Sequence, residues 1–181
     1  VRSATAMIKK ALLGGLEAGL IAREELYTLD DQSLFALLAG RSHPLFTLAD
    51  KVRKGCLFEM AAEFPYDEDL HRGLSDIKNR SRYEAALGEE FSEVLGIELL
   101  PEELIIDLPE PISFETGLYV SDENCYFAES SGVFNAETLK AFIKNLRVIR
   151  IFIDPVHKKG LKSYPGLQEI LHLRKKWLHL I

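Results

Sequence analysis

This sequence of 181 residues lacks several of the features that identify a class of protein. Its two cysteines, Cys56 and Cys125, are far apart and form no C-x-x-C pair, which argues against a disulfide scaffold and a thiolate zinc site. No apolar run approaches the ~18 residues that are needed to cross a bilayer. We therefore expect a cytoplasmic protein without a membrane partner, in which each cysteine is a small buried apolar residue.

The signature motifs of nucleotide-binding and hydrolytic enzymes are also missing. The sequence contains no G-x-x-x-x-G-K-[ST], no G-x-G-x-x-G, no G-x-S-x-G and no H-E-x-x-H. Its five histidines are scattered. His172 and His179 are spaced so that they would share one face of a helix, but a solvated basic face explains that spacing equally well. The residues themselves predict no catalytic residue and no metal site in this chain.

What the sequence does contain is a globular hydrophobic fraction, 47%, and an uneven distribution of charge. From His157 onward, six Lys and Arg residues stand against Glu169 alone. Because the whole chain carries −6 and this segment +5, the preceding residues carry −11. Such an acidic body argues against nucleic acid as a partner. The basic segment is either a solvated helix face or a docking site for an acidic surface, a neighbouring subunit or a polyphosphate.

Apolar residues at helical spacing predict a helical lobe over residues 1–63. Residues 4–20 carry an apolar stripe, together with glycines that weaken the helix and suit close packing against another helix. A second helix is expected to begin at Thr28, whose hydroxyl can cap it. A third helix is predicted from Pro44 to Gly55, and an extended or irregular segment follows.

After a break at residues 64–67 the pattern becomes that of an α+β lobe, residues 64–181. The predicted elements are a helix over 76–95, a strand over 104–106, a hairpin around the polar turn 121–124, a helix from Asn135, a strand over 148–153 and a helix from Pro165. Residues 148–153 are apolar except for Arg150, which predicts a central strand. The fold class is therefore α+β, a helical lobe followed by a small mixed sheet packed with helices.

Two groups of charged residues are candidates for chemistry. Adjacent carboxylates are frequent, but adjacency does not supply the defined separation and desolvated cleft that acid–base catalysis needs, so we assign them to helix starts and exposed faces. The cationic run Lys51, Arg53 and Lys54 lies near the end of the third predicted helix. An arginine beside a break in the chain offers a fork to phosphate oxygens. The same cations would also offset the dipole of the helix.

Several blocks, in this order, resemble the region that follows the metal site in HD-domain phosphohydrolases, in particular the deoxynucleoside triphosphate triphosphohydrolase-like branch. A long helix leads into a Leu-Asp-Asp helix at residues 28–34. A basic helix then ends before a Leu-Phe step, Leu57-Phe58, and an α+β portion closes with a strand that ends in Asp154-Pro155. The resemblance covers residues 1–155 and concerns pattern and order.

The resemblance implies that the catalytic metal lies outside this chain. In that family a histidine, a His-Asp dipeptide and a distant aspartate bind a divalent ion that activates water. No histidine here is followed by aspartate, so these ligands are expected to precede Val1, in an upstream HD-type catalytic domain from which the helix over 4–20 continues. The divalent metal belongs to the full-length protein, and we expect no cofactor in this chain.

The family also places an arginine just before the Leu-Phe step, close to the phosphates of the substrate. Alignment on Leu57-Phe58 puts Gly55 at that position, with Arg53 two residues earlier. Arg53 and then Lys54 are the phosphate-binding residues that the resemblance implies.

The resulting prediction is the accessory or regulatory region of an HD-type metal-dependent phosphohydrolase that acts on nucleotides and is not catalytic alone. Its expected partners are the upstream catalytic domain, a second copy in a homo-oligomer, and a nucleotide. The alternative is a non-catalytic ligand-binding or oligomerisation module, in which the basic segment docks an acidic patch such as residues 67–69 of a neighbouring copy.

Overall fold

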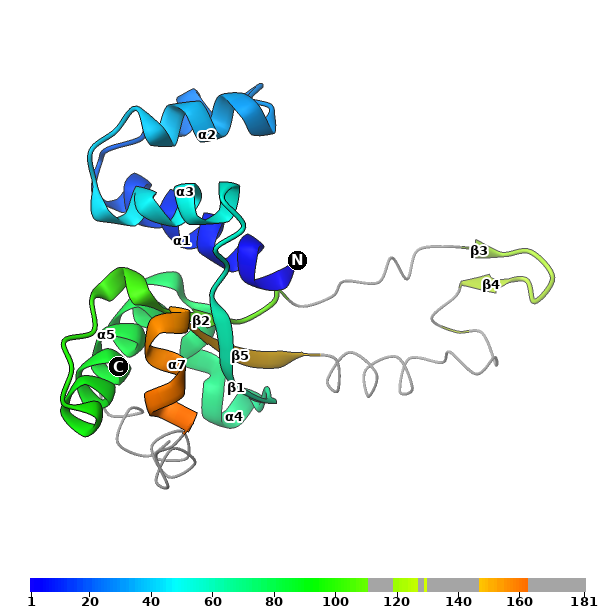
Figure 1. Cartoon of the computed structure of the whole chain (residues 1–181). Helices are drawn as coiled ribbons and strands as arrows, with labels where there is room; N and C mark the ends of the chain where they lie inside the picture. Colours follow the sequence, from blue (N-terminus) through cyan, green and yellow to red (C-terminus); the bar gives the residue numbers. More distant parts are fainter. Residues whose placement is uncertain (111–118, 127–128, 130–146, 163–181) are drawn as a thin grey trace.

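A computed structural model describes residues 1–110, 119–126, 129 and 147–162 (Figure 1). The helix predicted from Asn135 and the helix predicted from Pro165 lie outside the described residues. So do His172, His179 and most of the basic segment. None of the described helices combines the length and the apolar character that crossing a bilayer requires.

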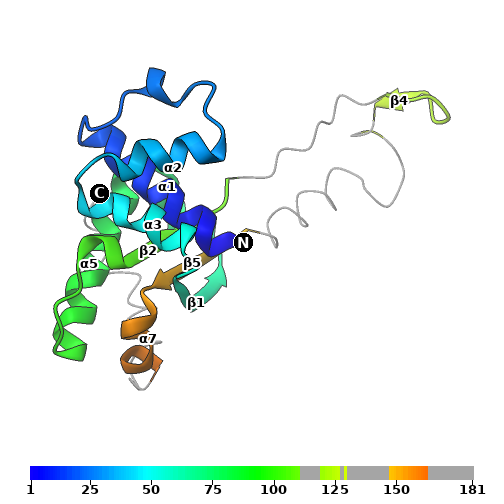
Figure 2. The ribbon, with the colours of Figure 1, turned by 45° about the horizontal axis from the view of Figure 1, so that its top comes forward.

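The helical lobe contains the three predicted helices, α1 (Arg2–Glu17), α2 (Asp31–Ala39) and α3 (Thr47–Arg53), with 3₁₀ turns at Arg23–Leu26 and Pro44–Phe46. Helix α3 packs against α1, and α2 packs against α3 (Figure 2). The close packing expected of the glycines in α1 is confirmed at Gly15, where an added Cβ would lie 2.9 Å from Phe46 Cε1.

The cap of α2 differs from the prediction. Asp30, not Thr28, precedes the helix, and its carboxylate accepts from the Ser33 N–H at 2.8 Å. Thr28 instead has a positive φ of 65°, and its hydroxyl donates to the Tyr27 carbonyl. A carboxylate two residues nearer to the first turn reaches the free amide more directly and also suits the positive end of the helix dipole.

A three-stranded sheet forms the centre of the second lobe. Its strands are β1 (Glu59–Pro65), β5 (Val148–Ile153) and β2 (Leu104–Asp107), in the order β1-β5-β2. The prediction that residues 148–153 form the central strand is confirmed. Both pairings are antiparallel, so the expectation of a mixed sheet was wrong. The fold class α+β is confirmed.

The remaining described elements surround this sheet. They are α4 (Glu68–His71), a 3₁₀ turn (Arg72–Ser75), α5 (Ile77–Leu95), a 3₁₀ turn (Pro101–Glu103) and α7 (Pro155–Lys162). The long helix predicted over residues 76–95 is confirmed as α5: Asp76 caps its start, and Gly96, with φ of 63°, ends it. The predicted hairpin is β3 (Tyr119–Val120) paired with β4 (Cys125–Tyr126) in a two-stranded sheet of its own.

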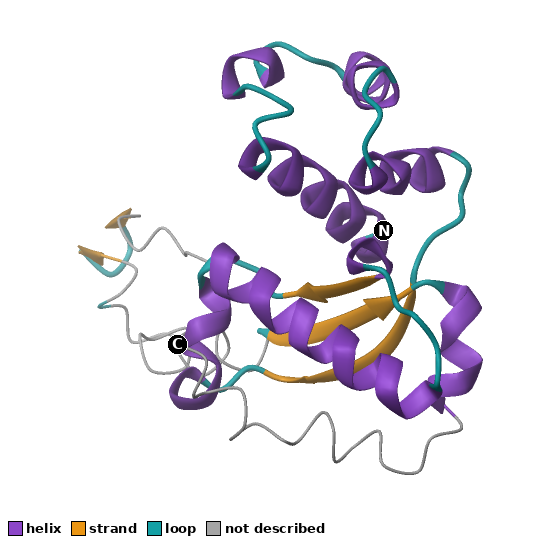
Figure 3. Ribbon diagram, turned by 90° about the vertical axis from the view of Figure 1, so that its left-hand side faces the viewer, coloured by secondary structure: helices purple, strands orange, loops and turns teal. Residues whose placement is uncertain are grey.

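The two faces of the sheet are buried by different parts of the chain (Figure 3). Alternate residues of β2 and β5, such as Ile106 and Ile151, pack with Leu87 and Phe91 of α5. On the opposite face, Ile105 and Phe152 pack with residues of the helical lobe. The result is three layers, with the sheet between the helical lobe and α5.

The predicted lobe boundary after residue 63 falls inside β1. The sheet therefore begins at Glu59, and the segment over residues 56–60 is partly a strand. The signal was weak because a bulge lies between Met60 and Ala62, and the strand ends in a proline. Since the helical lobe covers one face of the sheet, the two lobes share one packed structure.

Candidate functional site

The predicted phosphate-binding residues lie at the carboxyl end of α3. Arg53 is the last residue of the helix, Lys54 is its C-cap, and Gly55, with φ of 76°, turns the chain away. The Arg53 side chain is 59% exposed, and its Nη2 donates to Asp50 Oδ1 at 2.9 Å. Lys54 is also exposed. Both cations therefore face solvent, with part of the Arg53 charge offset by Asp50.

The third cation of this run, Lys51, lies in a different environment. Its Nζ donates to Asp154 Oδ2 at 2.5 Å and lies 5.3 Å from the centroid of the Phe58 ring. Asp154 follows β5 directly, and its other carboxylate oxygen accepts from the Val156 N–H at 3.1 Å. Lys51 thus ties α3 to the end of the central strand.

Asp154 is held in its ionised form. Burial by itself would raise the pKa of this carboxyl, but the hydrogen bonds from Lys51 and Val156, with the charges of Lys51 and His157, bring the pKa below its ordinary value. A general base needs a pKa near the working pH, so this carboxylate is suited to a structural role.

The chain after α3 passes beside the first turns of α1. Ser3 Oγ donates to the Phe58 carbonyl at 2.7 Å, and the Phe58 N–H donates to the Met7 sulfur at 3.4 Å. Phe58 is buried among residues of the helical lobe. Arg53 and Lys54 therefore lie within a few residues of the segment that binds the start of α1.

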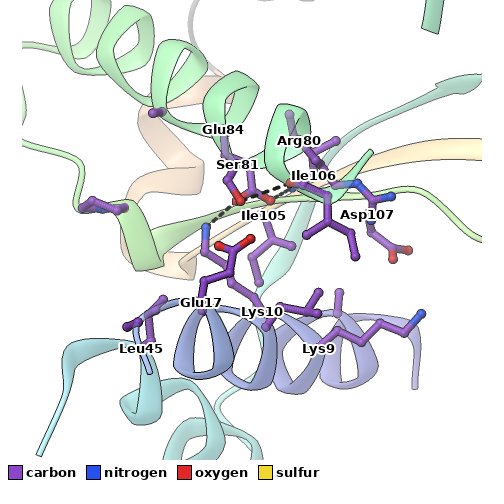
Figure 4. A pocket seen from close by; sticks show the side chains of 17 residues that line it. Lys9, Lys10, Glu17, Leu45, Arg80, Ser81, Glu84, Ile105, Ile106 and Asp107 are labelled. Atoms are coloured by element: carbon purple, nitrogen blue, oxygen red, sulfur yellow. Dashed lines mark hydrogen bonds and ion pairs between the residues drawn. The ribbon is translucent and has the colours of Figure 1, made fainter. Parts of the chain in front are cut away.

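A second candidate site was not predicted. It is a groove of about 430 Å³ between α1 and α5, over the edge of β2 (Figure 4). Its apolar surface comes mainly from Leu13, Leu45, Ile77, Ile105 and Ile106. Its charged residues are Lys9, Lys10, Glu17, Arg80, Glu84 and Asp107. Hence the groove combines an apolar surface with side chains of both charges, as ligand sites often do.

Lys10 and Glu84 cross the groove and meet at its centre. Lys10 Nζ donates to Glu84 Oε2 at 2.7 Å and to the Leu104 carbonyl at 2.6 Å. Glu84 Oε1 accepts from the Ile106 N–H at 2.7 Å. The exposed fractions of the Lys10 and Glu84 side chains are 13% and 12%. This pair therefore joins α1, α5 and β2.

Asp107, at one end of the groove, is also held in an ion pair. Its carboxylate accepts from Arg2 Nε at 2.5 Å and from Arg2 Nη2 at 3.1 Å, and it is 4% exposed. The first turn of α1 is therefore bound to the last residue of β2.

The cations that remain available come from opposite walls of the groove. Lys9 of α1 is exposed, and Arg80 of α5 uses only its Nε, which donates to the Leu74 carbonyl at 3.0 Å. Within the described residues, no partner is found for the Lys9 ammonium or for the terminal nitrogens of Arg80. Together they could bind an anionic group at this end of the groove. No local pattern predicts the site, because Lys10 and Glu84 are 74 positions apart.

Several other sequence predictions can be compared with the structure. Two of the carboxylate pairs, Asp30-Asp31 and Glu68-Asp69, lie at helix starts, as expected. The prediction of two buried cysteines was wrong: Cys56 is exposed in the turn out of α3, and Cys125 is half-buried on the small hairpin. Among the described residues, no three His, Cys, Asp or Glu side chains form a group that could hold a metal ion.

Comparison of the chain with protein-family models, with curated proteins and with solved structures finds no match.

Proposed function

We propose that this chain is an accessory region of an HD-type, metal-dependent phosphohydrolase that acts on nucleotides, and that it is not catalytic alone. Support comes from the described elements, which follow the order on which the resemblance rests. A long helix leads to the Leu-Asp-Asp helix α2, the basic α3 precedes Leu57-Phe58, and the central strand ends at Asp154-Pro155.

The observation that carries the proposal is the contact between Ser3 and Phe58. A catalytic domain joined to the start of α1 would lie beside the turn that follows α3, where Arg53 and Lys54 are exposed. A guanidinium can bind two phosphate oxygens at once, and an ammonium adds a point charge. The described residues supply no ligand set for the implied metal, so their role would be to position the substrate.

The test compares this chain with the longer protein that the proposal requires. We expect no release of phosphate or triphosphate from nucleoside triphosphates by the isolated chain with Mg²⁺ or Mn²⁺. In the longer protein, Arg53→Ala should lower kcat/KM at least about tenfold, because a charge-assisted contact to phosphate is lost. Arg82→Ala, which removes an exposed cation of α5, is the matched control. Turnover by the isolated chain would contradict the proposal.

A second candidate function, a ligand-binding or oligomerisation module, is favoured by the groove between α1 and α5. In the docking mode considered from the sequence, the acidic patch at residues 67–69 receives the basic segment of a neighbouring copy. Asp67 already caps α4, which leaves Glu68 and Asp69 exposed. If association is unchanged after Arg174, Lys175 and Lys176 are replaced by glutamate, this docking mode is wrong.

A further inference from the structure

The β3–β4 hairpin presents two exposed tyrosines side by side. Tyr119 and Tyr126 are paired across the strands, with ring centroids 5.7 Å apart and planes at 82°. Their exposed fractions are 56% and 52%. The Tyr119 hydroxyl donates to Asn124 Oδ1 at 2.5 Å, which fixes one ring against the turn. Paired tyrosines held in this way are typical of binding surfaces, since little conformational entropy is lost on contact.

The hairpin lies within a long acidic stretch of the chain. Residues 83–139 contain fourteen Asp and Glu residues and no Lys, Arg or His. On the described hairpin the carboxylates are Asp122, Glu123 and Glu129. Burial raises the pKa of the Cys125 thiol, and so do the charges of Glu123 and Glu129, which indicates a negative local potential. A surface that receives this hairpin must therefore be cationic as well as apolar.

The groove between α1 and α5 has both properties. A second hollow, of about 630 Å³, adjoins it and shares Leu13, Glu17 and Ile77 as walls. Four cations line the two hollows without an ion-pair partner among the described residues: Lys9, Arg23, Lys78 and Arg80. The carboxylates of Glu84 and Asp107 are already neutralised by Lys10 and Arg2, and Asp76 caps α5. Glu17 and Asp76 keep their charges, and four cations against these two carboxylates leave the extended groove with a net charge of +2.

Two cations outside the groove, Arg53 and Lys158, are less suited to receive the hairpin. Arg53 is paired with Asp50, and Lys158 is paired with Glu59. Neither residue lines one of the hollows described above. The extended groove, by contrast, offers Leu13, Leu16 and Ile77 for aromatic rings and cations for the flanking carboxylates and the ring faces.

We infer that the β3–β4 hairpin of one copy docks into the extended groove between α1 and α5 of a second copy. Tyr119 and Tyr126 contact the apolar walls, and Asp122, Glu123 and Glu129 face the four cations. Because the hairpin and the groove are different surfaces, two copies joined by one contact still have one free hairpin and one free groove. Association therefore continues until a ring closes, or it forms an open chain of copies.

The experiment measures the molar mass of the full chain against concentration by sedimentation velocity at low salt. We expect reversible association that weakens as salt is added, because exposed charges are screened. Glu123→Lys on the hairpin and Lys9→Glu in the groove should each weaken association at least about tenfold. Tyr126→Ala should do the same through the lost aromatic contact. Tyr27→Ala removes another exposed tyrosine, 71% exposed, and should have no effect.

The decisive arm mixes two variants that each retain one of the two surfaces. Tyr126→Ala keeps its groove and Lys9→Glu keeps its hairpin, and neither change creates a charge that complements the other, so the mixture should form a 1:1 heterodimer that stops growing. Circular dichroism of each variant checks that it is folded. The inference is overturned if the wild-type chain is monomeric at all concentrations, if the hairpin and groove variants associate like the wild type, or if the mixture does not form a heterodimer.

Discussion

Two ion pairs of this molecule, Lys10–Glu84 and Arg53–Asp50, have nearly the same geometry and very different surroundings. The donor–acceptor distances are 2.7 and 2.9 Å. The first pair is largely buried between α1, α5 and β2 and also satisfies two backbone groups. The second lies on the surface of α3 with both side chains more than 40% exposed. The comparison shows that the surroundings, rather than the distance, decide whether a charged residue supports the fold or remains available to a ligand.

The largest loss of stability is expected for Glu84→Ala, which removes one partner of the buried pair. It leaves the Lys10 ammonium largely buried without its counter-charge and leaves the Ile106 N–H without an acceptor. We expect a loss of about 3 kcal/mol in the free energy of unfolding, the low end for a buried pair because both side chains keep some exposure. Urea unfolding measures it. The double variant Lys10→Met, Glu84→Leu should lose less than the single one, and an equal or greater loss would argue that the pair is not coupled.

Asp107→Ala should have the next largest effect. Arg2 loses two hydrogen bonds, but its side chain is 39% exposed and can turn toward solvent. A loss of about 2 kcal/mol is expected, since the bonds are to a charged group. The same urea unfolding series tests it, with Asp122→Ala on the exposed hairpin turn as the control. A loss as large as that of Glu84→Ala would show that the exposure of the partner does not matter.

Asp154→Asn tests a third ion pair, Lys51–Asp154, through the pH dependence of the free energy of unfolding. The pKa of Asp154 is lowered in the folded state, so its ionised form contributes stability that is present above the unfolded pKa of about 4 and is lost as the pH falls through the folded pKa. At pH 7 the variant should be about 1 kcal/mol less stable than the wild type. Thermal unfolding between about pH 7 and pH 3 should show this difference shrinking on the acid side of about pH 4. A difference that is constant with pH would mean that charge is not its cause.

The smallest effect is expected for Arg53→Ala. Its partner Asp50 is exposed and in the same helix, so the free energy of unfolding should change by less than about 0.5 kcal/mol. A small loss of stability would distinguish Arg53–Asp50 from Lys10–Glu84. The proposed function requires the same variant to impair nucleotide hydrolysis in the longer protein. A large loss of stability would instead make Arg53 a structural residue.

The sequence predicts elements well where their signal is local. The cap at Asp76 and the stop at Gly96 define α5, and the unbroken apolar run over residues 148–153 defines the central strand. The cap of α2 was misplaced because three polar residues, Thr28, Asp30 and Asp31, compete for the position, and only the backbone decides between them. At β1 the bulge interrupts the alternation of apolar residues that would have revealed a strand.

The candidate sites also differ in whether local sequence features reveal them. The exposed cations at the end of α3 could be placed from sequence, because a helix and a following glycine are local features. The groove could not, because α1, α5 and β2 meet only through the tertiary fold. Nothing in the sequence around Lys10 indicates that its side chain meets Glu84.

The position of Lys10 and Glu84 has a consequence for how the molecule behaves in a crowded solution. Among the described strands, β2 lies at an edge of the sheet, where a foreign strand could add. The Leu104 carbonyl and the Ile106 N–H point to that open side, and the ion pair occupies both. The two side chains thus imitate a neighbouring strand and close the edge. A chain that has lost them would not only be less stable but would also expose a template for aggregation.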